Sequence, residues 1–253
     1  MVNASLKQKL ARGELVVGTL MTFDFWAGYL EIYKQVGMDF VFLDMEHGAA
    51  DLAKAEELCR TARLLDLPLI LRPEDSVYHL LRRYADMGPS GFMIPWTERE
   101  EQLETVKSAI FVPPRGRRGP GGPSVMRTRS LDLSGWQEVE DDFFVCFQVE
   151  TPRGIEALPG LADRDWIDAV MLGPYDLSLN LGHCGEWDHP VVVDAILSVL
   201  EGARAAGKPC GMVVGTLEQG RFWIDRGFHF LSFGEATGMV RAQASAFLSA
   251  VRG

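Results

Sequence analysis

The sequence lacks the features that most quickly assign a chain to a class of protein. It contains no apolar run of about 18 residues or more, so no membrane-spanning helix is predicted. Residues 1–14 are polar and lack the apolar segment of a signal peptide. No CxxC pair occurs, so neither a disulfide framework nor a thiolate zinc site is expected, and a reducing cytoplasm is the simplest location; the cysteines are Cys59, Cys146, Cys184 and Cys210.

An excess of positive charge is also missing. The formal net charge is −10 at pH 7. This charge argues against nonspecific binding to nucleic acid or to an anionic membrane. It does not exclude an anionic small-molecule substrate, because the charge close to a site decides what binds there.

The apolar content of the chain is divided into eight short segments. The chain has 253 residues, of which 47% are hydrophobic, and its length matches the roughly 250 residues of a typical (β/α)8 barrel. Nearly continuous apolar runs are typical of parallel strands that are covered on both faces. The predicted strands are residues 16–21, 40–46, 68–73, 91–96, 143–150, 169–176, 209–215 and 228–234.

Helical patterns lie between these segments, most clearly at 51–65, 76–87, 99–110 and 190–207. Alternating strands and helices indicate βαβ units and a parallel sheet. Eight such units favour a closed barrel over an open sheet. The sequence therefore predicts an α/β protein with one (β/α)8 TIM-barrel domain that spans residues 1–253.

One long gap, residues 97–142, interrupts this regular order. It contains the Pro-, Gly- and Arg-rich stretch VPPRGRRGPGGPS at 112–124. A solvated connector and a lid or substrate loop are equally consistent with its length and its arginines. We therefore keep two hypotheses for the loop 111–137: it covers the active site, or it is a solvated connector.

Polar residues follow four of the predicted strands. Active sites of (β/α)8 barrels lie at the carboxyl ends of the strands. The second and third strands end in Asp44, Glu46, His47 and Arg72, and the fifth and sixth end in Gln148, Glu150, Gly173, Pro174, Tyr175 and Asp176. We expect these side chains to meet at one end of the barrel.

Glu150 and Asp176 are candidate metal ligands. Two carboxylates on neighbouring strand ends repel each other unless a cation or a proton lies between them. Together with water and substrate oxygens they suit Mg2+ or Mn2+. The alternative is that each carboxylate caps the helix that follows it.

His47 is a candidate general base. Asp44 lies three residues before it, and an aspartate that accepts the imidazole N–H would fix the tautomer and raise the basicity of the ring. Glu46 would point to the other side if the strand stayed extended, where it would orient a water or a neighbouring side chain.

Arg72 ends the third strand, where its guanidinium could bind a carboxylate or an enolate oxygen. A buried ion pair with Glu46 or Glu150 is the structural alternative, and both could hold at once. The stretch GPYDLS at 173–178 opens a helix whose free N–H groups would suit a substrate carboxylate.

No lysine stands at the carboxyl end of a predicted strand. A barrel aldolase that forms a Schiff base needs a lysine in the core. The lysines are Lys7, Lys9, Lys34, Lys54, Lys107 and Lys208, the last of which precedes a strand. Carbon–carbon chemistry here would therefore use a metal ion as the electron sink.

The motifs around these residues resemble one known family over nearly the whole chain. They are LDMEHG (43–48), LRP (71–73), PPRGRRGPGG (113–122), QVET (148–151), GPYDLSLNLG (173–182) and HP (189–190). Together they resemble the metal-dependent, class II pyruvate aldolases of the HpcH/HpaI aldolase family.

The resemblance implies a (β/α)8 barrel that assembles as a homo-oligomer, a hexamer or a trimer, with an exchanged helix. It implies a divalent metal, Mg2+ or Mn2+ with Co2+ or Zn2+ as alternatives, held by Glu150 and Asp176. Pyruvate would chelate this metal, and Arg72 would stabilise the enolate oxygen. His47, oriented by Asp44, would act as the base.

Further positions follow from the same resemblance. Gln148 would contact the ketoacid or its water, and main-chain N–H groups around Tyr175 and Asp176 would hold the carboxylate. Asp86 matches a position that reaches into a neighbouring subunit's site in some members. The expected reaction is reversible cleavage of a 4-hydroxy-2-oxo acid to pyruvate and an aldehyde.

The aldehyde side departs from the family pattern. The run PSVMRTRSLDLSGWQEVE (123–140) and the segment FDFWAGYL (23–30) differ from it, and Trp96 ends the fourth strand. Trp26, Trp96 and Trp136 either shape the acceptor pocket or belong to the core or to a subunit interface. Decarboxylation of an oxaloacetate-like acid, capture of the enolate by another electrophile and a non-catalytic ketoacid-binding barrel are the alternative functions.

Overall fold

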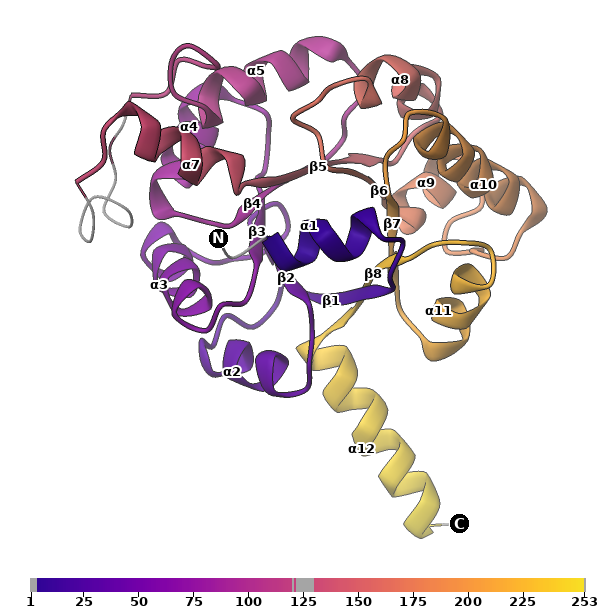
Figure 1. The fold of residues 1–253 in the computed structure, drawn as a ribbon. Coiled ribbons are helices and arrows are strands. Elements are labelled where there is room, and N and C mark those ends of the chain that lie inside the picture. Colours follow the sequence, from indigo (N-terminus) through magenta and orange to yellow (C-terminus); the bar gives the residue numbers. More distant parts are fainter. Residues whose placement is uncertain (1–3, 120, 122–129, 253) are drawn as a thin grey trace.

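The computed structural model describes residues 4–119, 121 and 130–252. Eight parallel strands close into a barrel in chain order, each paired with the next and β8 paired with β1 (Figure 1). The strands are β1 Val16–Met21, β2 Phe40–Asp44, β3 Leu69–Arg72, β4 Gly91–Ile94, β5 Phe144–Val149, β6 Ala169–Leu172, β7 Cys210–Val214 and β8 Phe230–Glu235. The predicted (β/α)8 barrel is confirmed.

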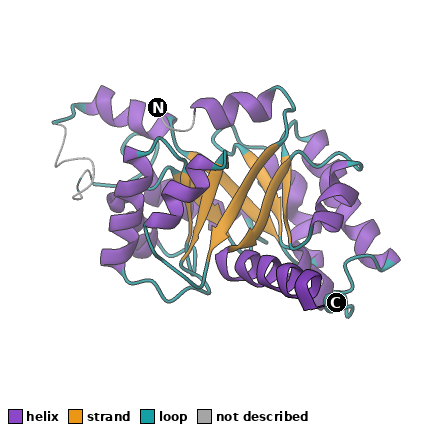
Figure 2. Cartoon of the chain, turned by 90° about the horizontal axis from the view of Figure 1, so that it is seen from below, coloured by secondary structure: helices purple, strands orange, loops and turns teal. Residues whose placement is uncertain are grey.

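Helices surround the barrel (Figure 2). They are α1 Ala4–Ala11, α2 Gly28–Gln35, α3 Leu52–Leu64, α4 Tyr78–Met87, α5 Glu100–Ile110, α7 Leu133–Asp141, α8 Pro152–Ala162, α9 Pro174–Asn180, α10 Pro190–Ala205, α11 Leu217–Ile224 and α12 Ala236–Arg252. No described helix is long and apolar enough to cross a membrane. All four cysteines lie in the described part of the chain and are free.

The strands are apolar over most of their length because both faces of the sheet are largely buried. Phe40 and Phe42 of β2 point into the barrel, where they pack with Phe230, while Val41 and Leu43 point outward against the helices. Helix α1 lies across the amino ends of the strands, and Leu6 and Leu10 of this helix join the inner cluster (Figure 1). The opposite, carboxyl ends are thus where a site can form.

The long segment after β4 lies at the amino ends of the strands. Helix α5 runs back from the carboxyl end of β4, and the chain then packs at the far end of the barrel, where Phe111 contacts Trp166. Glu140 of α7 accepts a hydrogen bond from the main-chain N–H of Val112 and pairs with Arg118. The described parts of the loop 111–137 therefore do not cover this chain's own carboxyl-end face, and residues 122–129 lie outside the described residues.

Helix α12 leaves the wall of the barrel instead of packing along it (Figure 1). Every residue from 240 to 252 is exposed, including Val240, Phe247 and Val251. Beside its origin, Val17 of β1 and Phe233 of β8 are only partly buried, whereas β2 to β6 are buried at every position. The ring of helices is thus incomplete at the β8–β1 edge of a single chain.

Candidate active site

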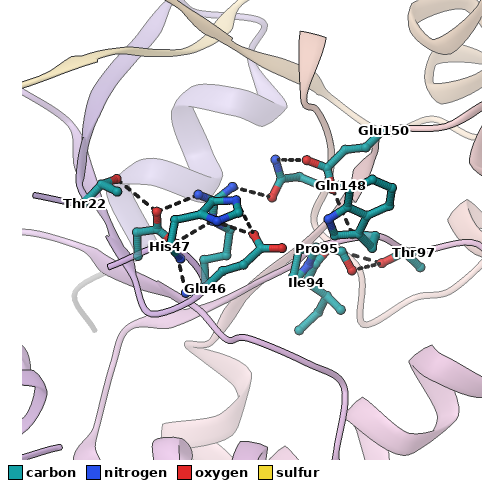
Figure 3. Close-up of polar contacts among 11 residues, drawn as sticks. Thr22, Glu46, His47, Ile94, Pro95, Thr97, Gln148 and Glu150 are labelled. Carbon is teal, nitrogen blue, oxygen red and sulfur yellow. Dashed lines mark hydrogen bonds and ion pairs between the residues drawn. The ribbon is translucent and has the colours of Figure 1, made fainter. Parts of the chain in front are cut away.

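Predicted polar residues of strands two, three and five meet at the carboxyl ends of the strands (Figure 3), and Asp176 after strand six lies close enough to raise the pKa of Glu150. Register explains part of this convergence, because Asp44 of β2 lies directly beside Arg72 of β3. Several strands end earlier than predicted: β2 stops at Asp44, β4 at Ile94 and β6 at Leu172. The residues that follow therefore lie in loops after β2 and β4 and in the start of α9 after β6, where the alternation of a strand no longer sets the direction of their side chains.

Asp44 and Arg72 form a buried, two-pronged ion pair. Arg72 donates from Nε to Asp44 Oδ1 at 2.9 Å and from Nη2 to Oδ2 at 2.7 Å. Asp44 is 0% and Arg72 6% exposed. Burial by itself would raise the pKa of Asp44, but the hydrogen bonds and the charge of Arg72 outweigh it, so this pKa lies below its ordinary value. Both groups are therefore charged, and the guanidinium is held in one orientation.

The expected contact between Asp44 and the His47 imidazole is replaced by a different one. Asp44 Oδ1 accepts the main-chain N–H groups of Glu46 and His47 at 3.1 and 3.3 Å, and Oδ2 accepts the Thr22 hydroxyl at 3.0 Å. The imidazole of His47 instead faces Glu46, with 3.7 Å between Nε2 and Oε2 (Figure 3). The reason is the bend after Asp44, which ends the alternation that would separate residues 46 and 47.

Glu46 lies between Arg72 and His47. Its Oε2 is 3.3 Å from Arg72 Nε, and this buried oxygen has no hydrogen-bond partner among the described residues. Burial raises the pKa of Glu46, the neighbouring charges of Asp44 and Asp176 raise it further, and Arg72 and His47 oppose the shift. The carboxyl group is therefore a proton acceptor of raised basicity beside the imidazole.

Glu150 is nearly enclosed and is fixed by two donors. The side chain of Gln148 donates to Oε1 at 3.1 Å, and the main-chain N–H of Trp96 donates to Oε2 at 2.9 Å. Gln148 in turn accepts a bond of 3.4 Å from Arg72 Nη1. Burial raises the pKa of Glu150 to about 7, and the charges of Asp176 and Glu46 add to the effect. A continuous chain of contacts thus runs from Asp44 to Glu150.

Gly173 makes room for the Glu150 carboxylate. A Cβ atom added at Gly173 would overlap with Glu150 Oε1 and crowd the rest of its carboxyl group. The residue directly after β6 must therefore be a glycine if Glu150 is to keep its position.

Asp176 lies in the first turn of α9, half-buried and close enough to raise the pKa of Glu150. The side chain of Asn180 ties this turn to Glu150, since its amide donates to the main-chain oxygens of Asp176 and Glu150 at 2.9 and 3.2 Å. Neither carboxylate caps a helix: Thr151 caps α8 and Gly173 occupies the N-cap of α9, after which Pro174 begins the helix. The capping alternative is therefore wrong.

The donor set fits a divalent cation. The charges of Glu46 and Asp176 raise the pKa of Glu150, that of Asp176 also raises the pKa of Glu46, and Glu46 Oε2 lacks a hydrogen-bond partner among the described residues. Carboxylate oxygens with room for water or ketoacid oxygens are the ligands that Mg2+ and Mn2+ prefer. A bound cation would relieve the repulsion that the protein alone leaves unbalanced.

Two of the remaining predicted residues lie elsewhere in the molecule. Asp86 stands near the end of α4, at the amino-end side of the barrel, where its carboxylate is 3.4 Å from Arg118. Trp136 is buried on α7 against Arg118 and is a core residue. Trp26 and Trp96, 60% and 41% exposed, follow β1 and β4 at the carboxyl-end face.

Sequence reasoning missed Thr22, Asn180 and the backbone role of Trp96. Thr22 and Asn180 bond to Asp44 and to main-chain oxygens, which only the closed barrel brings near. Trp96 takes a positive φ of 47°, a conformation that bulky residues rarely adopt and that stores strain at sites where the backbone is used. Its main-chain N–H donates to Glu150, and a main-chain contact of this kind cannot be predicted from the type of side chain.

Together, the barrel and this site, with an arginine and a cluster of carboxylates at the carboxyl ends of the strands, are typical of an enzyme of the (β/α)8 class. The family model of HpcH/HpaI aldolase/citrate lyase matches residues 26–242. The chain belongs to the HpcH/HpaI aldolase/citrate lyase family, which confirms the resemblance and with it the enzyme class, a carbon–carbon lyase.

Named relatives span nearly the whole chain. A hydroxypyruvate/pyruvate aldolase of Delftia acidovorans is 29% identical over 97% of this chain and 91% of its own length. A 4-hydroxy-2-oxovalerate aldolase of Rhodococcus jostii is 29% identical over 96% and 93%. The crystal structure of a family protein from Burkholderia cenocepacia covers 98% of this chain and 99% of its own, at 25% identity and a TM-score of 0.90.

Replacing Gly173 by alanine should displace the Glu150 carboxylate while the barrel stays folded. We expect Gly173→Ala to weaken Mn2+ binding by at least about tenfold, measured by calorimetry, because second-shell changes of this kind typically weaken metal binding 10- to 100-fold. Gly220→Ala is the matched control, since a Cβ there meets only Val214 at an ordinary 3.9 Å. Equal affinity in both variants would show that Glu150 is not held by this glycine.

The raised pKa of Glu150 should make the metal-free protein less stable as pH rises. Between the ordinary value of 4.5 and about 7, the folded protein holds this proton more tightly than the unfolded chain does. Stability is therefore lost as pH rises through this window, by up to about 3 kcal/mol. Urea unfolding of chelator-treated protein from pH 5 to 8 measures the slope.

Glu150→Gln should flatten this pH dependence, because the amide does not titrate. Glu138→Gln, a change of an exposed glutamate on α7, is the control and should leave the slope as in the unmodified protein. An unchanged slope in Glu150→Gln would assign the pH dependence to other groups.

Proposed function

We propose that the protein is a divalent-metal-dependent aldolase that reversibly cleaves a 4-hydroxy-2-oxo acid to pyruvate and an aldehyde. One observation carries the proposal: a fixed, charged Arg72 stands in a continuous chain of contacts with the buried carboxylate of Glu150. This geometry supports a cation site at Glu150 next to the positive charge of Arg72 at the carboxyl ends of the strands. The named aldolase relatives support the same reaction type.

Glu150 and Asp176 would hold the cation, with Mg2+ or Mn2+ preferred by their oxygen ligands and Co2+ or Zn2+ as alternatives. When bound, this ion polarises the carboxylate and keto oxygens of the 2-oxo acid and spreads the negative charge that develops on them. Main-chain N–H groups of Tyr175 and Asp176, in the first turn of α9 after Gly173 and Pro174, would orient the acid's carboxylate.

Arg72 would bind the keto oxygen as it gains charge. Its Nη1 makes only a long, 3.4 Å hydrogen bond to Gln148. A substrate oxygen could replace or share this weak bond at a small cost in free energy. Asp44 holds the guanidinium in place and is not a proton-transfer group, because its pKa is lowered and both of its oxygens are occupied. Stabilisation of a developing oxyanion by a preorganised cation is typically worth 10²- to 10³-fold in rate.

His47 would move the proton. Cleavage of the C3–C4 bond requires that the 4-hydroxyl lose its proton while the bonding electrons pass to C3 and the keto oxygen. The imidazole is exposed toward solvent and substrate, and Glu46 behind it can share the proton. Protonation of C3 then completes pyruvate. In the reverse direction, the same group would take a methyl proton from pyruvate.

Exchange of the pyruvate methyl protons tests the proposal without knowledge of the aldehyde. Pyruvate, Mg2+ and the enzyme in D2O should lose the methyl proton signal in NMR, and no exchange should occur after chelation. A panel of 4-hydroxy-2-oxo acids and oxaloacetate, assayed for pyruvate and CO2 release, separates aldolase from decarboxylase activity. No exchange and no pyruvate from any substrate with added metal would overturn the proposal.

Variants separate the roles within the site. Arg72→Lys keeps the charge but loses the fork, so we expect a fall in the exchange rate of about 10²-fold with the fold retained. His47→Asn should lower exchange comparably and remove a limb of the pH profile. His79→Ala, at an exposed position on α4, is the control and should exchange at the unmodified rate.

We also propose that the protein is a homo-oligomer in which α12 packs on a second copy. The exposed apolar side chains of α12 lie at helical spacing on one face, at Val240, Phe247 and Val251. The same chain leaves Val17 and Phe233 partly uncovered at the β8–β1 edge. An exchanged α12 would cover the apolar surface that each chain exposes.

Charges on the apolar face of α12 should therefore dissociate the assembly. We expect Phe247→Asp with Val251→Asp to lower the mass measured by light scattering to that of a smaller species. Ser245→Asp with Ser249→Asp adds the same charge to the opposite face and should keep the unmodified mass. A monomeric unmodified protein, or equal masses for both pairs, would contradict an exchanged helix.

A further inference from the structure

A second group of metal-binding side chains lies outside the site described above. One ring nitrogen each of His183 and His189 and one carboxylate oxygen of Glu186 all lie within 4.8 Å of one another. These residues belong to the loop 181–189, which joins α9 to α10 at the carboxyl-end face. Neither Glu150 nor Asp176 is part of the group.

The backbone of this loop explains why the three side chains share one side. The main-chain N–H of Glu186 bonds to the carbonyl of His183 at 2.9 Å, and that of His189 bonds to the carbonyl of Glu186 at 3.1 Å. Successive hydrogen bonds between residues three apart stack the side chains at i, i+3 and i+6 above one another. The grouping therefore follows from local structure.

The loop is also fixed at both of its ends. The buried hydroxyl of Ser178 accepts the N–H of Gly185 at 2.9 Å, and the carbonyl of Ser178 accepts the N–H of His183 at 2.8 Å. Trp187 packs edge-on against Phe222 of α11, with ring centroids 5.3 Å apart. The three candidate ligands are thus presented by a preorganised segment.

The three side chains are in close contact with one another, and in the described part of the chain one of their nitrogens lacks a partner. The rings of His183 and His189 are stacked with centroids 3.6 Å apart, and Nδ1 of His183 is 3.5 Å from Glu186 Oε2. Nδ1 of His189 is buried without a hydrogen-bond partner among the described residues. A buried nitrogen of this kind needs a partner, and either a water or a cation must supply it.

We propose that His183, Glu186 and His189 form a second metal site, selective for a borderline transition-metal ion such as Zn2+ or Co2+. Two imidazoles and one carboxylate are a frequent ligand set for these ions, whereas Mg2+ prefers oxygen ligands alone. Ligands of one tetrahedral ion lie roughly 3.3 Å apart. Binding would therefore draw the three ligand atoms together and turn the two imidazole rings out of their stacked arrangement, so that each ring plane contains the ion. A water completes the coordination.

The location gives the ion a positioning role. The loop follows α9, whose first turn carries Tyr175 and Asp176, and Ser178 of the same helix is bonded to the loop at two points. An ion held by the loop would fix the start of α10 to the end of α9. Its effect on turnover would therefore pass through the placement of α9, without contact with the reacting atoms.

Cobalt binding tests the site independently of activity. The full-length protein is freed of metal with a chelator, and Co2+ is titrated in the presence of saturating Mg2+, which occupies the carboxylate site. We expect one Co2+ per chain with the visible bands of tetrahedral coordination. His183→Ala and His189→Ala should each weaken this binding by at least about tenfold, and binding should fall at acidic pH because ligation needs neutral imidazole.

Controls keep the result independent of folding and of the other site. Glu186→Gln keeps the shape of the side chain and should also weaken binding, with an unchanged circular dichroism spectrum of the metal-free protein. His79→Ala and Asp176→Asn should bind Co2+ as the unmodified protein does. Absence of tetrahedral bands, an affinity of the two histidine variants equal to that of the unmodified protein, or loss of binding in Asp176→Asn would overturn the proposal, whatever the exchange assay gives.

Discussion

The buried ion pair between Asp44 and Arg72 is the interaction on which the rest of the site depends. Two charges taken out of water are tolerated only if they are paired and their remaining hydrogen-bonding groups are satisfied. Thr22 and the turn after β2 satisfy Asp44, and Gln148 extends the network from Arg72 to Glu150. Removal of Asp44 would therefore free the guanidinium and also unmake the turn that places Glu46 and His47.

The carboxylates of Glu46, Glu150 and Asp176 set the second constraint, because the protein brings these negative charges together without enough positive charge to balance them. Glu150 has a pKa of about 7 as a result of burial and of its acidic neighbours, although Arg72 lies nearby. Gly173 leaves space for the carboxylate, and Trp96 accepts an unusual backbone conformation to bond to it. Backbone strain and repulsion between carboxylates are both typical of functional sites. The positive charge of a bound cation would offset the repulsion.

The direction of the chain separates the two ends of the barrel by role. All eight strands point toward the site and α5 returns from it, so Phe111, Val112 and the group of Asp86, Arg118 and Glu140 lie at the amino ends. The length and the arginine content of the loop 111–137 were equally consistent with a lid and with a connector. Neither property says at which end of the barrel a loop emerges. Helix α12 leaves this return path and exposes Val240, Phe247 and Val251.

The sequence by itself determined the barrel, the strand order and the residue types at the carboxyl ends, because apolar periodicity and strand–helix alternation are local properties. Motifs then determined the family. Only the tertiary structure decided which partner each charge has. Asp44 bonds to Arg72 and not to the imidazole of His47, since the strand ends at Asp44, two residues earlier than predicted, and the chain bends there. The pairing of His183 with His189 and the departure of α12 likewise depend on turns and on missing neighbours, which no local pattern records.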